Sequence, residues 1–192
     1  AMAVKKAIHK STFVVDMPFG TYRNIKEAKK NAKKILKMTH CDGVKLESNG
    51  KNFVVIKNLV KSGIPVMGHI GYTPQYKKAF KPQGLKKNEA RKLIYEAEQI
   101  EKAGAFSLVL ECISSKVAKK ITEKIKIPTI GIGSSNLCDG QILVTDDLIG
   151  LSGFYPKFVK KYLDLEKIIG KTIKRFKEDV RKRKFPNKTN AY

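Results

Sequence analysis

Acidic residues end three of the apolar runs in this sequence. Asp16 ends the run in "TFVVDMP", Glu47 ends that in "GVKLES", and Glu111 ends that in "FSLVLEC". His69 lies near the end of a fourth run, "IPVMGHI". Lys45 stands two residues before Glu47, so the two share one face if the run is a strand. Alone, each residue has an ordinary interpretation as a turn cap, a solvated loop residue or a core histidine. Because the pattern recurs in successive units, we expect these side chains to meet in one functional site.

The residue types in this set favour oxygen ligands around a hard cation. Carboxylates without a pair of cysteines or histidines at ligand spacing suit Mg²⁺ rather than Zn²⁺. The sequence has no Walker A motif, and "GIGSSNLCDG" lacks the glycine spacing of a dinucleotide fingerprint. It shows no nucleophile elbow either, although a Ser-His-Asp triad stays open at this point.

Alternating strand-like and helix-like stretches must position these residues. The apolar runs are separated by amphipathic stretches such as "NIKEAKKNAKKILKM", and a fifth run, "IPTIGIG", follows the others. This alternation predicts a parallel sheet with helical crossovers, to which "LIGLSG" adds a candidate sixth strand. An open doubly wound sheet and a closed barrel both place active sites at the carboxyl ends of strands. A barrel normally needs eight strands and about 250 residues, and at most six strands are counted in this sequence.

The composition indicates one globular domain over residues 1–192, with a helical C-terminal part from about residue 155. The net charge of +23 raises the question of nucleic acid. Only 5 of the 40 basic residues are Arg, and no nucleic-acid-binding signature accompanies them. We therefore attribute the charge to lysines on solvated helix faces and expect no nucleic acid partner. No apolar run approaches the ~20 residues of a bilayer span. Three widely spaced cysteines favour a reducing cytoplasm.

Six blocks of sequence resemble the ketopantoate hydroxymethyltransferase family in order and spacing, over essentially the whole chain. The blocks are "VVDMPFGTY", "GVKLE", "VMGHIGYTPQ", "LVLEC", "IPTIGIGSSNLCDGQILVTDDLIG" and "YPKFVKKY". The combination of "GHIGYTPQ" with "GIGSSNLCDGQILV" is specific, whereas neither short piece is so alone. The resemblance implies an α/β fold of the (β/α)₈ TIM barrel family, of which this sequence holds six of the eight strands.

The resemblance also implies an activity and a set of site residues. Family members of the pantothenate pathway transfer a one-carbon unit from 5,10-methylenetetrahydrofolate to 3-methyl-2-oxobutanoate, which gives 2-dehydropantoate. A folate and a 2-oxo acid are therefore the implied small-molecule partners. By position, Asp16 and Glu47 look like Mg²⁺ ligands; Asp16, Lys45 and His69 look like substrate contacts; and Glu111 resembles the catalytic base. A homo-oligomer, often a decamer, is implied as well.

The sequence departs from the family pattern in three places. Family members begin with a further strand-helix-strand region upstream of Ala1, which carries a Gly-Asp-Ser motif with another metal ligand and a substrate contact. The segment 76–87 lacks the family's Gly pair and the Arg after "QG", and "GIGSS" replaces the commoner GIGAG. Two other interpretations stay open. One is a related Mg²⁺-dependent lyase or aldolase for 2-oxo acids, and the other is an inactive barrel fragment that binds polyanions.

Overall fold

The apolar runs of the sequence form a parallel sheet in the computed structural model, which describes residues 1–192. The strands are β1 (Val14–Asp16), β2 (Gly43–Glu47), β3 (Val66–Gly71), β4 (Ser107–Glu111), β5 (Thr129–Ile132) and β6 (Gly140–Gln141). They lie in the order β1-β2-β3-β4-β5-β6, and all neighbouring pairs are parallel. A doubly wound sheet reverses its order at a switch point, whereas sequential order is that of a barrel wall. The expected α/β fold with six barrel-type strands is confirmed.

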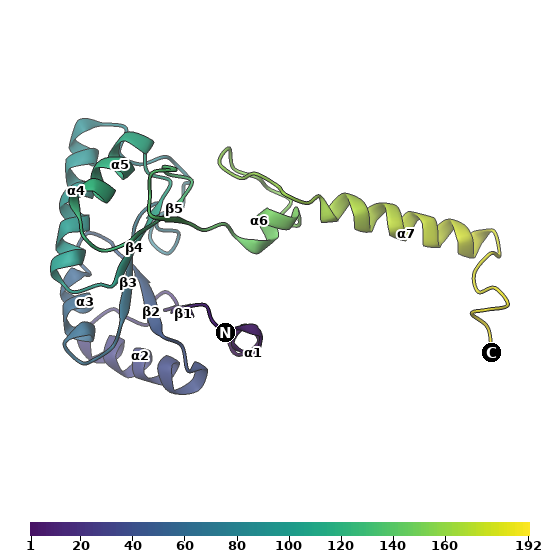
Figure 1. Cartoon of the computed structure of the whole chain (residues 1–192), viewed down its shortest axis with the longest axis horizontal. Helices are drawn as coiled ribbons and strands as arrows, with labels where there is room; N and C mark the ends of the chain where they lie inside the picture. The colour runs from purple at the N-terminus through teal and green to yellow at the C-terminus, as the bar shows by residue number, and fades with distance from the viewer. The chain divides into compact units, whose positions relative to one another are not determined.

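Helices connect the strands and lie on one side of the sheet. A short helix, α1 (Met2–Ala7), precedes β1. The connecting helices are α2 (Ile25–Thr39), α3 (Phe53–Val60), α4 (Lys87–Lys102) and α5 (Ser115–Lys124). Figure 1 shows these four helices on the same side of the strands. Right-handed crossovers that always step in one direction produce this one-sided arrangement.

The helix α2 illustrates how the sequence specifies these elements. The side chain of Asn24 accepts a hydrogen bond from the backbone N–H of Glu27 at 2.9 Å, which caps the first turn. Ala28 and Ala32 are fully buried against the core, and the lysines between them face outward or lie at the boundary. His40, in the left-handed conformation, ends the helix.

The hydrophobic core fills the space between the sheet and these helices. Alternate residues of the central strands face it, and each of them is fully buried: Val44, Leu46, Val66, Ile70, Leu108 and Leu110. The facing helices contribute Ala32, Ile56, Leu59, Ala97, Ile100, Ala118 and Ile121. Because strand side chains alternate between faces, the remaining strand residues point to the face without helices. That second face carries the polar residues considered below.

The chain consists of two compact units, residues 1–142, which hold the sheet, and residues 143–192. The second unit contains α6 (Thr145–Ile149) and α7 (Leu165–Arg181). The prediction of a strand in "LIGLSG" is wrong: α6 occupies Leu148 and Ile149 and ends at Gly150, which is left-handed. The sixth strand is instead β6. The long helix α7 begins after the cap Asp164, later than the helical start expected near residue 155.

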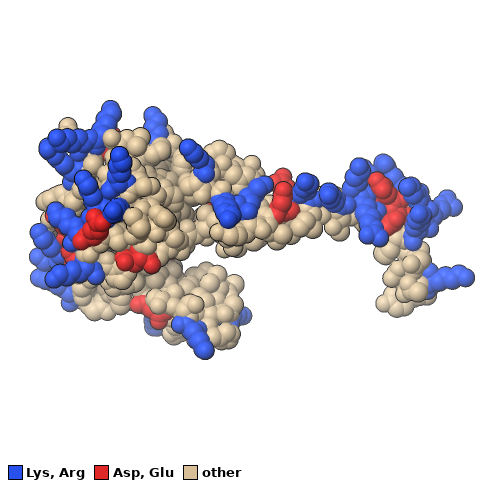
Figure 2. Space-filling model, turned by 45° about the horizontal axis from the view of Figure 1, so that its top comes forward, with Lys and Arg blue, Asp and Glu red and all other residues tan.

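Basic side chains dominate the surface of both units. Figure 2 shows Lys and Arg far outnumbering Asp and Glu on the face drawn. On α2, five of the six lysines are exposed, as expected for solvated helix faces. No helix in residues 1–192 combines the length and apolar character needed to cross a membrane.

Candidate functional site

The strand register brings the predicted site residues onto one face of the sheet. Asp16 is paired with Lys45, and Glu47 is paired with His69. Glu111 is paired with Gly71, two residues after His69. Paired residues of parallel strands, and residues two apart on one strand, share a face. All five predicted residues therefore project from the face opposite the core helices, at the carboxyl ends of β1 to β4.

His69 lies between the two central carboxylates. Its Nε2 is 3.1 Å from Oε2 of Glu111, and its Nδ1 is 4.0 Å from Oε1 of Glu47. Only 1% of His69 is exposed. Although the first distance is short enough for a hydrogen bond, neither ring nitrogen makes an aligned one. The ring is thus an unsatisfied polar group placed where a proton could pass to or from Glu111, with Glu47 farther away on its other side.

Glu47 is buried and held by the loop that follows β3. Its Oε2 accepts a hydrogen bond from the backbone N–H of Gln75 at 2.9 Å. The side chain of Gln75 donates to the carbonyl of Met17 at 3.0 Å and accepts from the hydroxyl of Tyr22. Burial raises the pKa of Glu47, although the Gln75 N–H, His69 and Lys45 oppose this shift. The role of Gln75 as a support for Glu47 was not predicted from the sequence.

Asp16 and Lys45 form an ion pair at the rim of the same face. The carboxylate of Asp16 is 57% exposed, whereas the Lys45 side chain is 18% exposed. An exposed pair of this kind adds little stability. Asp16 is therefore the accessible acid of the site, and Glu47 is the buried one.

The site offers two carboxylates, Asp16 and Glu47, to a divalent cation. No group of three or more His, Cys, Asp or Glu residues in residues 1–192 is placed to hold a metal. Mg²⁺ is usually held by one or two carboxylates, with water and substrate oxygens completing its coordination. Asp16 and Glu47 fit this pattern, since both supply oxygen from adjacent strands on one face. The ion pair with Lys45 competes for one oxygen of Asp16.

Backbone geometry fixes the end of β4 that carries Glu111. The carbonyl of Glu111 accepts a hydrogen bond from Tyr72 N–H at 2.8 Å. Gly71 packs directly against this carbonyl, with a φ of +100°. Cys112 follows with a φ of +51°, and its thiol is buried. Burial raises the pKa of the Cys112 thiol to about 12, which keeps it protonated and unreactive.

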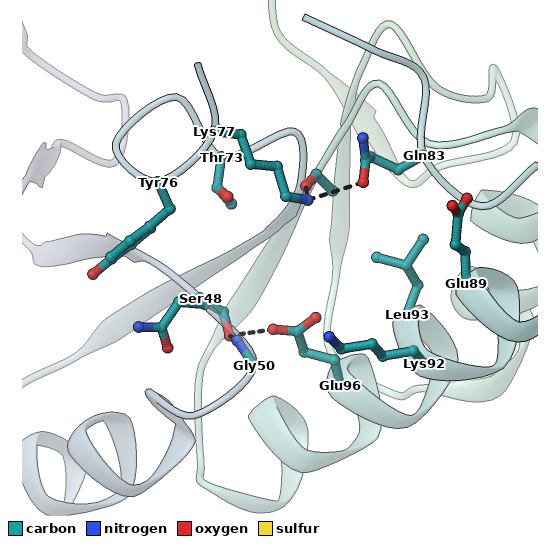
Figure 3. A pocket seen from close by; sticks show the side chains of 12 residues that line it. Ser48, Gly50, Thr73, Tyr76, Lys77, Gln83, Glu89, Lys92, Leu93 and Glu96 are labelled. Atoms are coloured by element: carbon teal, nitrogen blue, oxygen red, sulfur yellow. Dashed lines mark hydrogen bonds between the residues drawn. The ribbon is translucent and has the colours of Figure 1, made fainter. Parts of the chain in front are cut away.

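A pocket of about 330 Å³ lies beside this site, between the β2 and β3 loops and α4. Figure 3 shows its lining, which includes Ser48, Thr73, Lys77 and Glu96. Ser48 directly follows Glu47, so the pocket adjoins the same end of the sheet. The sequence contained a signal for Glu96: it stands in phase with the buried Leu93, Ala97 and Ile100 of α4.

Sequence comparisons identify the family to which the chain belongs. A family model described as ketopantoate hydroxymethyltransferase matches residues 1–188. The 3-methyl-2-oxobutanoate hydroxymethyltransferase of Pelagibacter ubique is 50% identical over 190 residues, 99% of this chain and 74% of that protein. The protein of the same name from Bartonella tribocorum is 47% identical, over 99% of this chain and 72% of its own length. That of Helicobacter pylori is 44% identical, over 95% and 70%. The chain belongs to the ketopantoate hydroxymethyltransferase family.

Proposed function

We propose that this chain catalyses hydroxymethyl transfer from 5,10-methylenetetrahydrofolate to 3-methyl-2-oxobutanoate, which yields 2-dehydropantoate. The observation that carries the proposal is the placement of His69 between Glu111 and Glu47 on the face opposite the core helices. Membership of the family supports the substrate class, and this geometry supports the choice of acid–base groups.

Glu111 acts as the general base. Its carboxylate removes the proton from C3 of the 2-oxo acid, next to the carbonyl, and the carbanion attacks the methylene carbon of the folate. His69, 3.1 Å away, receives or shares the proton that Glu111 takes. Lys45, on the same face, offsets negative charge that develops on the substrate. Both bonds from the methylene carbon to N5 and N10 of the folate break: one is replaced by the new bond to C3, and the other by a bond to the oxygen of water. The proton taken from C3 and one proton of that water go to the two nitrogens, so tetrahydrofolate leaves and the transferred carbon becomes the hydroxymethyl group.

Asp16 and Glu47 hold the Mg²⁺ in this proposal. The cation supplies Lewis-acid polarisation of the substrate's carbonyl group. Glu47 is fixed by Gln75, so its free oxygen is oriented before the cation arrives. Lys45 occupies one oxygen of Asp16 and leaves the other for the cation; opening of this ion pair would free the Lys45 ammonium for the substrate carboxylate.

The proton-transfer step can be tested without folate. In D₂O, the chain with Mg²⁺ should replace the C3 proton of 3-methyl-2-oxobutanoate with deuterium. NMR measures the rate at which the signal of this proton disappears. Glu111→Gln lowers the exchange rate by about 10²–10⁴-fold, since it removes the base. Glu123→Gln, an exposed surface change, serves as the control. Equal exchange in Glu111→Gln and the control would remove Glu111 from the mechanism.

The metal assignment has a readout other than turnover. A bound cation raises the unfolding temperature, because it stabilises the folded chain by RT ln(1 + c/Kd), where c is the concentration of free Mg²⁺. Asp16→Asn and Glu47→Gln abolish the Mg²⁺-dependent increase in Tm, whereas Glu123→Gln retains it. An unchanged Mg²⁺ response in both site variants would show that the cation binds elsewhere.

The same proposal includes folate dependence, self-association and a cytoplasmic location. Tetrahydrofolate formed in step with 2-dehydropantoate distinguishes the transferase from a folate-independent lyase. Sedimentation velocity measures the homo-oligomer, and a monomer at all concentrations would contradict that part of the proposal.

A further inference from the structure

The pocket beside the site contains a buried polar group that has no partner, the hydroxyl of Thr73. Thr73 is 2% exposed, and its hydroxyl makes no hydrogen bond. Figure 3 shows this side chain projecting into the pocket from the β3 loop, opposite Ser48 and Glu96. A buried hydroxyl without a partner costs free energy that a bound ligand would recover. The pocket therefore has the character of a binding site.

A buried carboxylate forms the opposite wall. Glu96 is 8% exposed and accepts a hydrogen bond from the Ser48 hydroxyl through Oε1. No protein donor is bonded to its Oε2. A carboxylate accepts hydrogen bonds but cannot donate them, so a ligand must offer N–H or O–H groups at this wall.

Lys77 supplies the third polar group. Its ammonium donates to the Gly71 carbonyl at 2.5 Å and to Oε1 of Gln83 at 2.9 Å. Burial lowers the pKa of Lys77. Its hydrogen bonds tie the loop to the end of β3 and form a wall next to Thr73 (Figure 3).

The charges of the pocket balance. Glu89 and Glu96 carry two negative charges, and Lys77 and Lys92 carry two positive charges. Such a lining has no net attraction for the anionic 2-oxo acid or for a free cation. It suits a neutral group that carries donors and acceptors together, with Leu93 as an apolar surface for a flat ring. A volume of about 330 Å³ is at the small end for ligand sites, which fits one end of a larger molecule.

We propose that this pocket binds the pterin end of the folate co-substrate. This inference rests on the proposed function, which requires a folate. The pterin is neutral and flat, and its amino and lactam N–H groups form an edge that can donate to Glu96. Thr73 donates to or accepts from the ring. The pocket adjoins the acid–base groups because Ser48 follows Glu47 and Gly71 is paired with Glu111.

Binding of pterin itself to the full chain provides the test. The chain has no Trp, so the ligand's fluorescence anisotropy can be followed without tryptophan emission. Glu96→Gln weakens binding by about tenfold or more, because it replaces a charged acceptor with an amide. Thr73→Val weakens it several-fold and removes only the hydroxyl. The matched control on α4 is Glu98→Gln, whose carboxylate pairs with Lys124 outside the pocket.

Circular dichroism establishes that each variant is folded, and Thr73→Val alone carries the test if Glu96→Gln is not. Absence of pterin binding to the unaltered chain, or equal binding by both pocket variants and the control, would overturn the proposal. The C3 exchange of the unaltered chain separates this outcome from failure of the proposed function. Exchange without pterin binding removes the pocket assignment only. Pterin binding that depends on Glu96 without exchange removes the proposed function and retains the pocket.

Discussion

Substituting Gly71 with Ala is the most direct test of how the fold positions Glu111. Gly71 ends β3 with a φ of +100°, a conformation that residues with a Cβ adopt rarely. A Cβ at this position would clash with the Glu111 carbonyl oxygen and lie 2.7 Å from Cγ1 of Ile113. The first contact is with backbone, so a side-chain rotation cannot relieve it. Either β4 moves or the strand pair opens.

The cost of this change has two parts. The left-handed backbone costs roughly 1–2 kcal/mol for a residue with a Cβ. Overpacking against a close backbone adds about 1–3 kcal/mol. The free energy of unfolding therefore falls by about 2–5 kcal/mol, which corresponds to about 4–20 °C in Tm for a chain of this size.

Gly63→Ala provides a matched control. Gly63 has a φ of +73°, but a Cβ there meets no atom within 4 Å. Only the conformational cost applies, which is roughly 1–2 kcal/mol, or about 2–8 °C in Tm. Thermal unfolding by circular dichroism measures both variants, and the C3 exchange assay measures the displacement of Glu111. If Gly71→Ala loses no more Tm than Gly63→Ala and exchanges normally, the close approach of β3 and β4 does not position Glu111.

Three further predictions concern buried groups of the site. The Cys112 thiol has a pKa near 12 against an ordinary value of 9.0, so it should resist a thiol reagent until the chain unfolds. The midpoint of urea unfolding should fall as the pH rises from 9 toward 12, because the thiol ionises at lower pH in the unfolded chain than in the folded one. Glu47→Gln raises the Tm at pH 7, because burial disfavours the charged carboxylate and the amide is neutral; each kcal/mol of this cost removed adds about 2–4 °C. The gain vanishes below pH 4.5, the ordinary pKa of a Glu, where Glu47 is protonated in both the folded and the unfolded chain. Gln75→Ala weakens the Mg²⁺-dependent Tm increase and Tyr22→Phe weakens it less, because only the first removes both contacts that hold the loop over Glu47. A fast reaction of Cys112 in the folded chain would contradict the first prediction, and a lower Tm of Glu47→Gln at pH 7 would contradict the second. An unchanged Mg²⁺-dependent Tm increase in Gln75→Ala would contradict the third.

The sequence predicted the central strands and their shared face because local patterns determine both. Strand side chains alternate regularly, so the spacing of Lys45 and Glu47 alone places them on one side. The parallel arrangement followed from the helices between the runs. The shared face of Asp16, Glu47 and Glu111 is seen in the register, whereas their roles stay predictions.

The features that the sequence did not reveal depend on contacts between distant segments. Gln75 reaches Glu47 across 28 residues and Met17 across 58. The two-residue strand β6 exists because Gly140 and Gln141 pair with β5 next to them, and no periodicity can show so short an element. The orphan hydroxyl of Thr73 is invisible in sequence, since burial without a partner is a property of the folded loop.

The loop after β3 connects the two sites of this proposal. The backbone N–H of Gln75 donates to Glu47 on the acid–base face, whereas Thr73 and Lys77 line the pocket. Lys77 also bonds to Gly71, whose partner is Glu111, so the loop is anchored at the strand that carries the base. A ligand that orders Thr73 in the pocket therefore stabilises the backbone that orients Glu47. Since coupling between two sites is reciprocal, Mg²⁺ and pterin should each tighten the binding of the other. Independent binding of the two would mean that the loop holds Glu47 in place without help from the pocket.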